Sequence, residues 1–166
     1  MTDADSIIVE GPVVGTRRQC EAILRALPDW FGVESAILRY ASDIDSLPTF
    51  VAATGGAVVG FLTLRRHTEF SGEIHVMAVR PEMHRRGIGR RLLERAEKWL
   101  AAENVEYLQV KTLAPSRPDD CYERTRSFYF AMGFRPLEEL RDFWDANNPC
   151  LLMVKKLPGH TRAHEA

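Results

Sequence analysis

The sequence predicts a mixed α/β domain whose antiparallel first half is followed by a strand–helix–strand unit. Residues 73–79 alternate apolar side chains between two faces, and Pro81 ends this strand because proline cannot donate to a ladder. From Ile88 to Leu100 the apolar positions recur at helical spacing, and residues 106–113 alternate again. This order implies a parallel pair of strands with a right-handed crossover. We therefore expect a mixed sheet of about six to seven strands with about four helices.

The elements expected before residue 73 follow from apolar spacing and from turn residues. Gly55-Gly56 between two β-rich runs is a hairpin signal, Gly11, Pro12 and Gly15 end the first strand, and Pro28 stops the first helix. The predicted elements are a strand at 6–10, helices at 17–30 and 34–44, and strands at 49–54 and 57–64.

Beyond residue 113 the pattern predicts a loop, a fourth helix that ends at Gly133, and short strands. The predicted elements are a loop at 114–120, a helix at 122–132, a strand at 134–136, an irregular acidic and aromatic segment through 148, and a strand at 151–155. We expect one domain over residues 1–158 and a polar, disordered tail over 159–166. His160 and His164 have the spacing of a metal pair but no further ligands, so we expect no metal site.

Composition fits an ordinary single domain. The chain has 166 residues, 45% hydrophobic and 27% charged, and its net charge of −1 argues against nonspecific nucleic-acid binding. No apolar run approaches about 20 residues and no charged-then-apolar leader is present, so we expect neither a membrane span nor a signal peptide. The three widely spaced cysteines fit reduced thiols. We expect a cytoplasmic protein.

The loop between the strand at 73–79 and the helix from Ile88 predicts a pyrophosphate site. Gly87 and Gly89 stand at the first helical turn, where backbone N–H groups lack internal partners and carry the positive end of the helix dipole. Arginines at 85, 86, 90 and 91 add positive charge. The lysine and serine or threonine of an NTP-binding loop are missing, and so is the third glycine of the dinucleotide fingerprint. The alternative is a strand-to-helix turn with a solvated basic rim.

Two motifs resemble the GNAT acetyltransferases. HRRGIG, residues 84–89, resembles the family's acetyl-CoA loop, with His84 where glutamine or arginine is usual. SFYFAMGF, residues 127–134, resembles its tyrosine, three residues, Gly-Phe motif, with Tyr129 at the tyrosine position. Tyr122 stands where the family often has asparagine. The resemblance implies the GNAT fold, with its fourth and fifth strands splayed apart.

By this resemblance the co-substrate is acetyl-CoA, and no metal takes part. Backbone groups of the fourth strand would pair with the pantetheine arm, and the loop would hold the diphosphate. The residues implied are Met77, Ala78 and Val79 on the strand, and Arg85, Arg86, Gly87, Ile88, Gly89 and Arg90 in the loop.

The resemblance implies two catalytic residues. Glu73 stands at the position of the general base, a task suited to a desolvated carboxylate with a raised pKa. It lies about 13 Å along the strand from Met77, so we expect it to act through water. Tyr129 would protonate the departing thiolate. The alternatives are a solvated strand-end glutamate and a tyrosine that only anchors its helix. We expect His75 to bind a local partner rather than to act as a base. We expect Cys121 to be a buried structural thiol rather than an acyl carrier.

The acceptor side is the least determined part of the prediction. Trp30, Phe31 and Trp144, with Phe143, lie on segments that flank the acceptor groove in this fold; packing within the core or a dimer is the alternative. The acidic residues 138, 139, 142 and 145 fit a solvated face better than an amine site. We expect transfer of acetyl to a primary amine of a small molecule, by a monomer or homodimer. The alternatives are a protein or peptide acceptor, or a CoA or acyl-CoA sensor without turnover.

Overall fold

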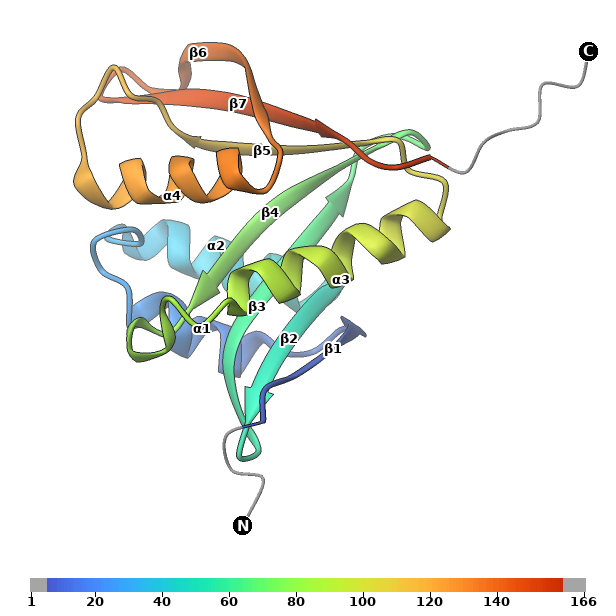
Figure 1. The fold of residues 1–166 in the computed structure, drawn as a ribbon. Helices are drawn as coiled ribbons and strands as arrows, with labels where there is room; N and C mark the ends of the chain where they lie inside the picture. Colours follow the sequence, from blue (N-terminus) through green and yellow to red (C-terminus); the bar gives the residue numbers. More distant parts are fainter. Residues whose placement is uncertain (1–5, 160–166) are drawn as a thin grey trace, which may run out of the picture. The chain divides into compact units, whose positions relative to one another are not determined.

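The structure, a computed structural model, describes residues 6–159. It contains a mixed sheet with strand order β1-β2-β3-β4-β5-β7-β6 (Figure 1). The chain forms two compact units. The first joins the described residues up to Arg65 with His75–Ala96, and the second joins Arg66–Ile74 with the described residues from Glu97 onward. His160 and His164 lie outside the described residues, as does almost all of the predicted tail.

The described residues form seven strands and four helices, which confirms the expected six to seven strands and about four helices, and the bounds of several elements differ from those expected. The elements are β1 (Ile8–Val13), α1 (Arg17–Arg25), α2 (Glu34–Ser46), β2 (Thr49–Thr54), β3 (Ala57–Arg66), β4 (Ser71–Val79), a 3-10 turn (Pro81–Met83), α3 (Ile88–Ala102), β5 (Tyr107–Leu113), α4 (Asp120–Ala131), β6 (Arg135–Asp145) and β7 (Asn148–Lys156). Within the described part of the chain, no helix is both long and apolar enough to cross a membrane.

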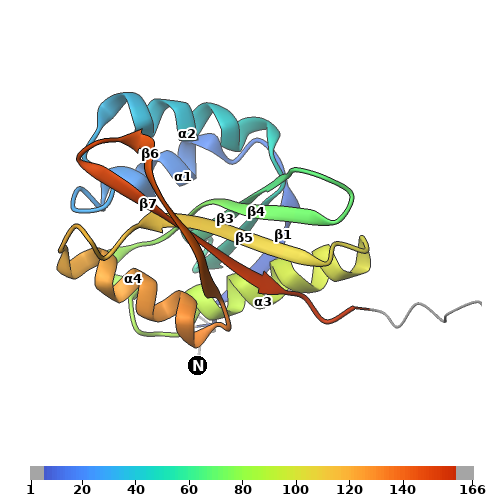
Figure 2. The same cartoon turned by 90° about the horizontal axis from the view of Figure 1, so that it is seen from above.

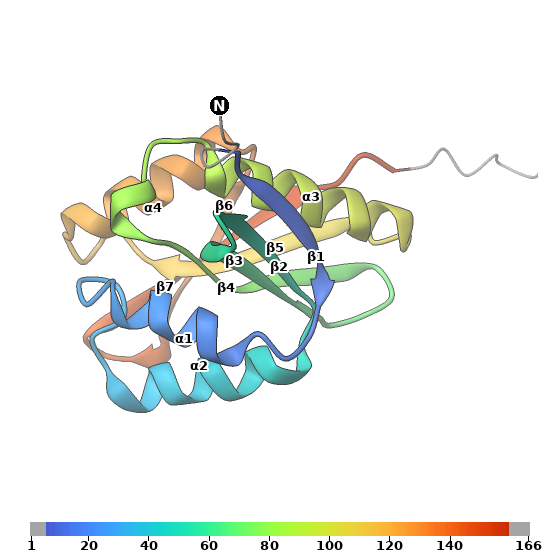
Figure 3. The same ribbon diagram turned by 90° about the horizontal axis from the view of Figure 1, so that it is seen from below.

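The first unit is an antiparallel meander covered by helices. β2 and β3 meet at the predicted Gly55-Gly56 turn, where Thr54 pairs with Ala57. The apolar stripes of α1 and α2 supply Cys20, Ile23 and Ile44 to a core that also contains Phe61 of β3. Figures 2 and 3 show α1 and α2 on one side of these strands and the start of α3 on the other. α3 lies so close to β3 that a Cβ on Gly60 would stand 3.2 Å from Ile88.

The second unit contains the predicted parallel pair. The first residues of β4 pair with β5 from Ser71↔Tyr107 to Ile74↔Val110, and β5 pairs antiparallel with β7 along its whole length. α4 packs against β5. Its first turn is capped by Asp119, whose carboxylate accepts a hydrogen bond of 3.0 Å from the Tyr122 backbone N–H.

Two predicted ends in the first unit were wrong. Gly11 and Pro12 do not end β1, which runs to Val13 with an irregular register after Glu10. β1 is an edge strand, where a missing proline N–H deprives no neighbour of a bond. α1 ends at Arg25, short of the expected span to Trp30. Pro28 stops the helix as predicted, because it cannot donate a helical bond and disfavours helix at the residue before it.

The segment predicted to be irregular before residue 148 was also a wrong prediction, because it forms most of β6. Most side chains of this strand are exposed, so it shows no alternation of apolar residues. It lies beside β7, its hydrogen-bonding partner, which holds it in place (Figure 1). The register shifts between Pro136 and Glu138 and again between Leu140 and Asp145. Such irregularities are common on edge strands, where they interrupt pairing with other chains.

Candidate functional site

The basic loop before α3 has the features of an anion site. Residues 84–87 are exposed, and Arg85 and Gly87 have positive φ values of 63° and 73°. A Cβ on Gly87 would meet nothing within 4 Å, so the backbone there is open to a ligand. The first helical bond, from Arg91 N–H to the Gly87 carbonyl at 3.1 Å, leaves the N–H groups before Arg91 without helical acceptors. Open amides, a helix start and several arginines together fit a diphosphate.

His84 fastens this loop to the end of β4. Its Nε2 donates to the Val79 carbonyl at 2.7 Å, and the Trp30 ring stands edge-on to it with centroids 6.1 Å apart. The histidine that departs from the family pattern therefore has a structural contact within the first unit. Sequence reasoning did not predict this contact, because nothing in the spacing of residues 79 and 84 indicates a side-chain bond.

The strand residues expected to pair with the pantetheine arm lie beyond the β4–β5 ladder. That ladder's last pair is Ile74↔Val110, and Met77, Ala78 and Val79 follow it. Ala78 is buried, and the other two residues are half-buried. The Val79 carbonyl already accepts the bond from His84, so a new pairing at this residue would use its N–H.

Glu73 is buried and bound on both carboxylate oxygens. Lys111 Nζ donates to Oε1 at 2.8 Å and His67 Nε2 donates to Oε2 at 2.5 Å. Burial raises the pKa of Glu73, but the hydrogen bonds and positive charge of Lys111 and His67 outweigh it and hold the pKa below the ordinary 4.5. The raised pKa expected from the sequence was therefore wrong. Lys111 becomes a neighbour only through the strand register, in which Glu73 pairs with Gln109.

Tyr129 lies in the apolar interior of the second unit. It is 5% exposed, and its ring is edge-on to those of Phe128 and Phe134, each with centroids 5.4 Å away. The Tyr129 carbonyl accepts from Phe134 N–H at 3.0 Å, closing α4 across Gly133, whose φ is 94°. This turn explains the spacing of the tyrosine and the Gly-Phe pair.

His75 has the local partner expected from the sequence. Its Nε2 donates to Asp43 Oδ2 at 2.8 Å, and the same carboxylate oxygen lies 3.3 Å from Arg65 Nη2. The Tyr40 ring stands edge-on to the imidazole at 5.4 Å. The first unit thus contains an Asp–His–Arg cluster that sequence reasoning did not assemble.

The aromatic residues predicted for the acceptor side divide between the units. Trp30 and Phe31 are half-buried against the core of the first unit. Phe143 and Trp144, on β6 of the second unit, are 53% and 44% exposed. Lys111 Nζ lies 5.1 Å from the centroid of the Phe143 ring, so it contacts an aromatic face as well as Glu73.

Two of the three cysteines lie in surroundings that make their thiols unreactive. Burial raises the pKa of Cys20 and of Cys150 to about 11, against smaller lowering effects from Thr16 and Lys111 respectively. Cys121 was expected to be buried, but it is half-buried because it lies near the exposed start of α4, where Arg124 Nη2 donates to its sulfur at 3.4 Å. Among residues 6–159, no group of three or more His, Cys, Asp and Glu could hold a metal.

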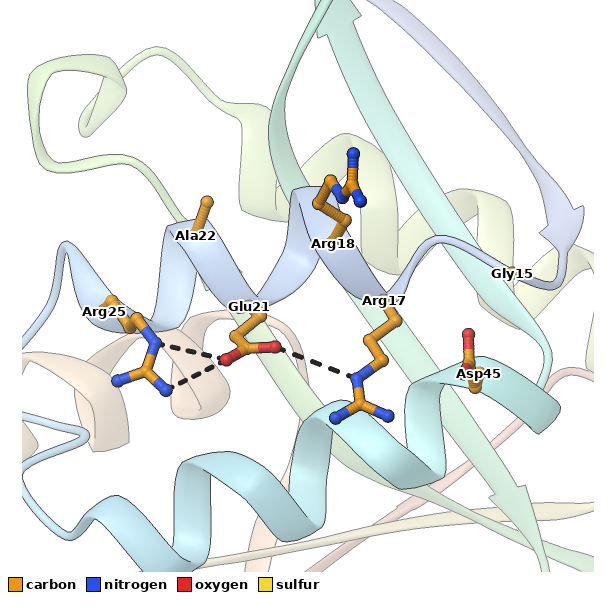
Figure 4. A pocket seen from close by; sticks show the side chains of 7 residues that line it. All are labelled: Gly15, Arg17, Arg18, Glu21, Ala22, Arg25 and Asp45. Atoms are coloured by element: carbon orange, nitrogen blue, oxygen red, sulfur yellow. Dashed lines mark hydrogen bonds and ion pairs between the residues drawn. The ribbon is translucent and has the colours of Figure 1, made fainter.

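An open pocket of about 600 Å³ lies elsewhere in the first unit (Figure 4). Its lining residues are Gly15, Arg17, Arg18, Glu21, Ala22, Arg25 and Asp45. Glu21 is paired with Arg25 at 2.9 Å and with Arg17 at 3.8 Å, so much of the charge is balanced within the pocket. None of the predicted site residues lines it.

Sequence comparison identifies a family that this chain resembles over most of its length. The profile of the "Acetyltransferase (GNAT) family" matches residues 19–134. A curated relative from Chlorobaculum tepidum, an uncharacterised N-acetyltransferase, is 33% identical over 90 residues, covering 54% of this chain. The matched stretch spans about half of that relative, 51% of its length.

Solved structures confirm the predicted fold. A GNAT-family acetyltransferase from Desulfovibrio desulfuricans has a TM-score of 0.81 at 15% identity, covering 92% of this chain and 100% of its own. The ribosomal-protein-S18-alanine N-acetyltransferase from Escherichia coli has a TM-score of 0.75 at 15% identity, covering 95% of this chain and 98% of its own. The aminoglycoside 6′-N-acetyltransferase from Enterococcus faecium has a TM-score of 0.72 at 19% identity, covering 92% of this chain and 98% of its own. At these identities the likeness establishes the fold alone.

Proposed function

Because the chain belongs to the GNAT acetyltransferase family, we propose that it is an acetyl-CoA-dependent N-acetyltransferase acting on a primary amine by direct transfer in a ternary complex. The observation that carries this proposal is the open basic loop at the start of α3, with positive φ at Arg85 and Gly87. Family membership alone would fit a chain that had lost this loop, and this chain retains it.

The loop residues Arg85, Arg86, Gly87, Ile88, Gly89 and Arg90 would hold the diphosphate. Ile88 is buried and anchors the helix, while the arginines are exposed and supply charge. Met77, Ala78 and Val79 would pair with the pantetheine arm through the backbone, as a short added strand does. The Val79 N–H is well suited, since its carbonyl is engaged by His84.

Glu73 and Tyr129 would carry out the two proton transfers of the reaction. Bound acetyl-CoA supplies an activated thioester, from which the amine displaces the CoA thiolate. Glu73 would receive the amine proton through a water, and its lowered pKa keeps it in the accepting, ionised form at neutral pH. Since an alkyl ammonium has a pKa of about 10.4, the low basicity of Glu73 favours an acceptor that arrives as the free amine. Tyr129 would return a proton to the thiolate.

We propose a small-molecule amine as the acceptor, with Trp30, Phe31 and Trp144 as weak candidates for contacting it. The exposed rings of Phe143 and Trp144 support a site for an apolar or cationic group on β6. The E. faecium enzyme acts on aminoglycosides and the E. coli enzyme on an alanine of a ribosomal protein, so a protein amine is the alternative. A panel of amines, antibiotics and peptides, assayed for release of CoA thiol, separates these classes.

Binding of CoA tests the proposal directly, with a matched pair of variants. Gly87 and Gly56 have similar φ values of 73° and 80°, and open space surrounds the position of a Cβ at both. Alanine at either position should therefore cost a similar backbone strain of about 1–2 kcal/mol. We expect Gly87→Ala to weaken CoA binding at least tenfold in calorimetry and Gly56→Ala to leave it unchanged. Wild-type protein that shows no thermal stabilisation by CoA would refute the proposal.

The fully engaged carboxylate of Glu73 favours a second candidate function, a sensor that binds acyl-CoA without turnover. In that case the ion pair with Lys111 would serve stability only. A sensor would bind CoA as an enzyme does, but no amine in the panel would raise thiol release above the rate of spontaneous hydrolysis.

A further inference from the structure

Thr112 of β5 carries a buried hydroxyl that the fold does not use. The residue is 4% exposed, and its Oγ1 has no hydrogen-bond partner within residues 6–159. Another buried threonine shows the ordinary arrangement: Thr63 is bonded to Thr49 through their hydroxyls at 2.9 Å. Leaving a buried hydroxyl unpaired destabilises the fold, and valine would fill nearly the same volume without this cost.

The position of Thr112 links the hydroxyl to the proposed reaction. Thr112 lies beyond Val110, the last β5 residue in the ladder with β4. Its side chain points to the same face of the sheet as Val110, opposite to the face on which Lys111 binds Glu73. On its other side β5 stays paired, with Thr112 opposite Leu151 of β7. The helix that carries Tyr129 packs against the same strand. An unpaired donor thus lies past the end of the β4–β5 ladder, on the strand against which the helix of Tyr129 packs.

We propose that Thr112 Oγ1 binds the pantetheine arm of the acyl-CoA by donating a hydrogen bond to one of its amide carbonyl oxygens. This inference rests on the proposed function. The arm consists of apolar carbons and neutral amides, and an amide carbonyl that enters a buried site needs a donor. A neutral hydroxyl suits such a group on a stretch of chain whose neighbouring residues Val110, Leu113 and Ala114 are buried. The charged diphosphate end is served by the arginines instead.

Thr112→Val tests the inference through stability and binding together. We expect the free variant to melt at the wild-type temperature or above it, because an unpaired hydroxyl is removed. We expect its Kd for CoA, measured by calorimetry, to rise about threefold to tenfold, the loss of one hydrogen bond. The Kd for adenosine 3′,5′-bisphosphate, which lacks the pantetheine arm, should not change. Thr112→Ser, which keeps the hydroxyl, should bind CoA within twofold of wild type.

Thr63→Val is the matched control, since it removes a buried hydroxyl that has a partner. It should lower the melting temperature and leave the Kd for CoA unchanged. The inference is overturned if Thr112→Val binds CoA as wild type does, if it weakens both ligands equally, or if it melts lower or fails to fold, which would mean that the hydroxyl already had an internal partner. Failure of the proposed function is distinct, because it would appear as absent CoA binding in the wild type.

Discussion

At Glu73, the interactions of the carboxylate with Lys111 and His67 outweigh the effect of burial on its pKa. The sequence identifies the glutamate and its place at the start of the strand, but the direction of its pKa depends on which side chains reach it. Lys111 and His67 reach it through the β4–β5 register and the β3–β4 turn. Neither contact follows from apolar spacing, so sequence reasoning found the residue and missed its electrostatics.

Lys111→Met should reduce the dependence of stability on pH. A carboxylate with a lowered pKa stabilises the fold above its ordinary value of 4.5, and this stabilisation is lost as the pH falls through the folded-state pKa. We expect the variant to lose about 2 kcal/mol at pH 7 and to show a smaller further loss on acidification than wild type. Thermal unfolding between pH 7 and pH 4 measures both effects.

Lys155→Met is the control for that variant. Lys155 pairs with Glu97 at 2.7 Å in the same unit, with exposures similar to those of the Lys111–Glu73 pair. If Glu73 is the base, the acidic limb of the pH profile of kcat/KM should move to higher pH in Lys111→Met and stay in place in Lys155→Met. Equal profiles in all three proteins would remove Glu73 from the mechanism.

The substitution Tyr129→Phe distinguishes a tyrosine that acts as a general acid from one that only anchors α4. Loss of a general acid should lower kcat about 100-fold or more while the Kd for CoA stays within about twofold. A tyrosine that only anchors α4 would instead lower the melting temperature and leave kcat almost unchanged in the folded protein. Tyr107→Phe, at an exposed position of β5, is the control for loss of a phenol.

At the scale of elements, the sequence predicted those with a strong local signal. Gly55-Gly56 placed the hairpin, and the apolar stripes placed α2, α3 and α4 within a few residues. Only the start of β6 was predicted; the rest was missed because its exposed side chains carry no alternation, and its strand conformation comes from pairing with β7. The end of β1 was missed because an edge strand tolerates the proline that would end a central one.

The cap of α4 gives a prediction at this scale. Asp119→Ala removes the acceptor for the Tyr122 N–H and should cost about 1 kcal/mol, or about 2–4 °C in melting temperature for a chain of this size. Asp142→Ala, an exposed position on β6, should change stability by less than about 0.5 kcal/mol. Equal effects of the two substitutions would show that the cap contributes nothing specific.

At the scale of the whole molecule, the chain passes between its two compact units at Arg65, Ile74 and Ala96, so that β4 and α3 each belong to both. Periodicity predicted the order of the elements but gave no sign of this division, because it depends on contacts between segments distant in the sequence. Since neither unit is a continuous stretch of chain, we propose that the two fold together as the single domain expected over residues 1–158.

The buried cysteines offer a way to watch this folding without adding a probe. Cys20 belongs to one unit and Cys150 to the other, and both are 0% exposed. In a thiol-alkylation experiment with mass-spectrometric readout, both should therefore label slowly, and cooperative opening predicts equal protection factors for them across a urea series. Half-buried Cys121 should label first, so its labelling shows that the alkylating reagent is active. Unequal protection factors for Cys20 and Cys150 would instead show that each unit can open independently of the other.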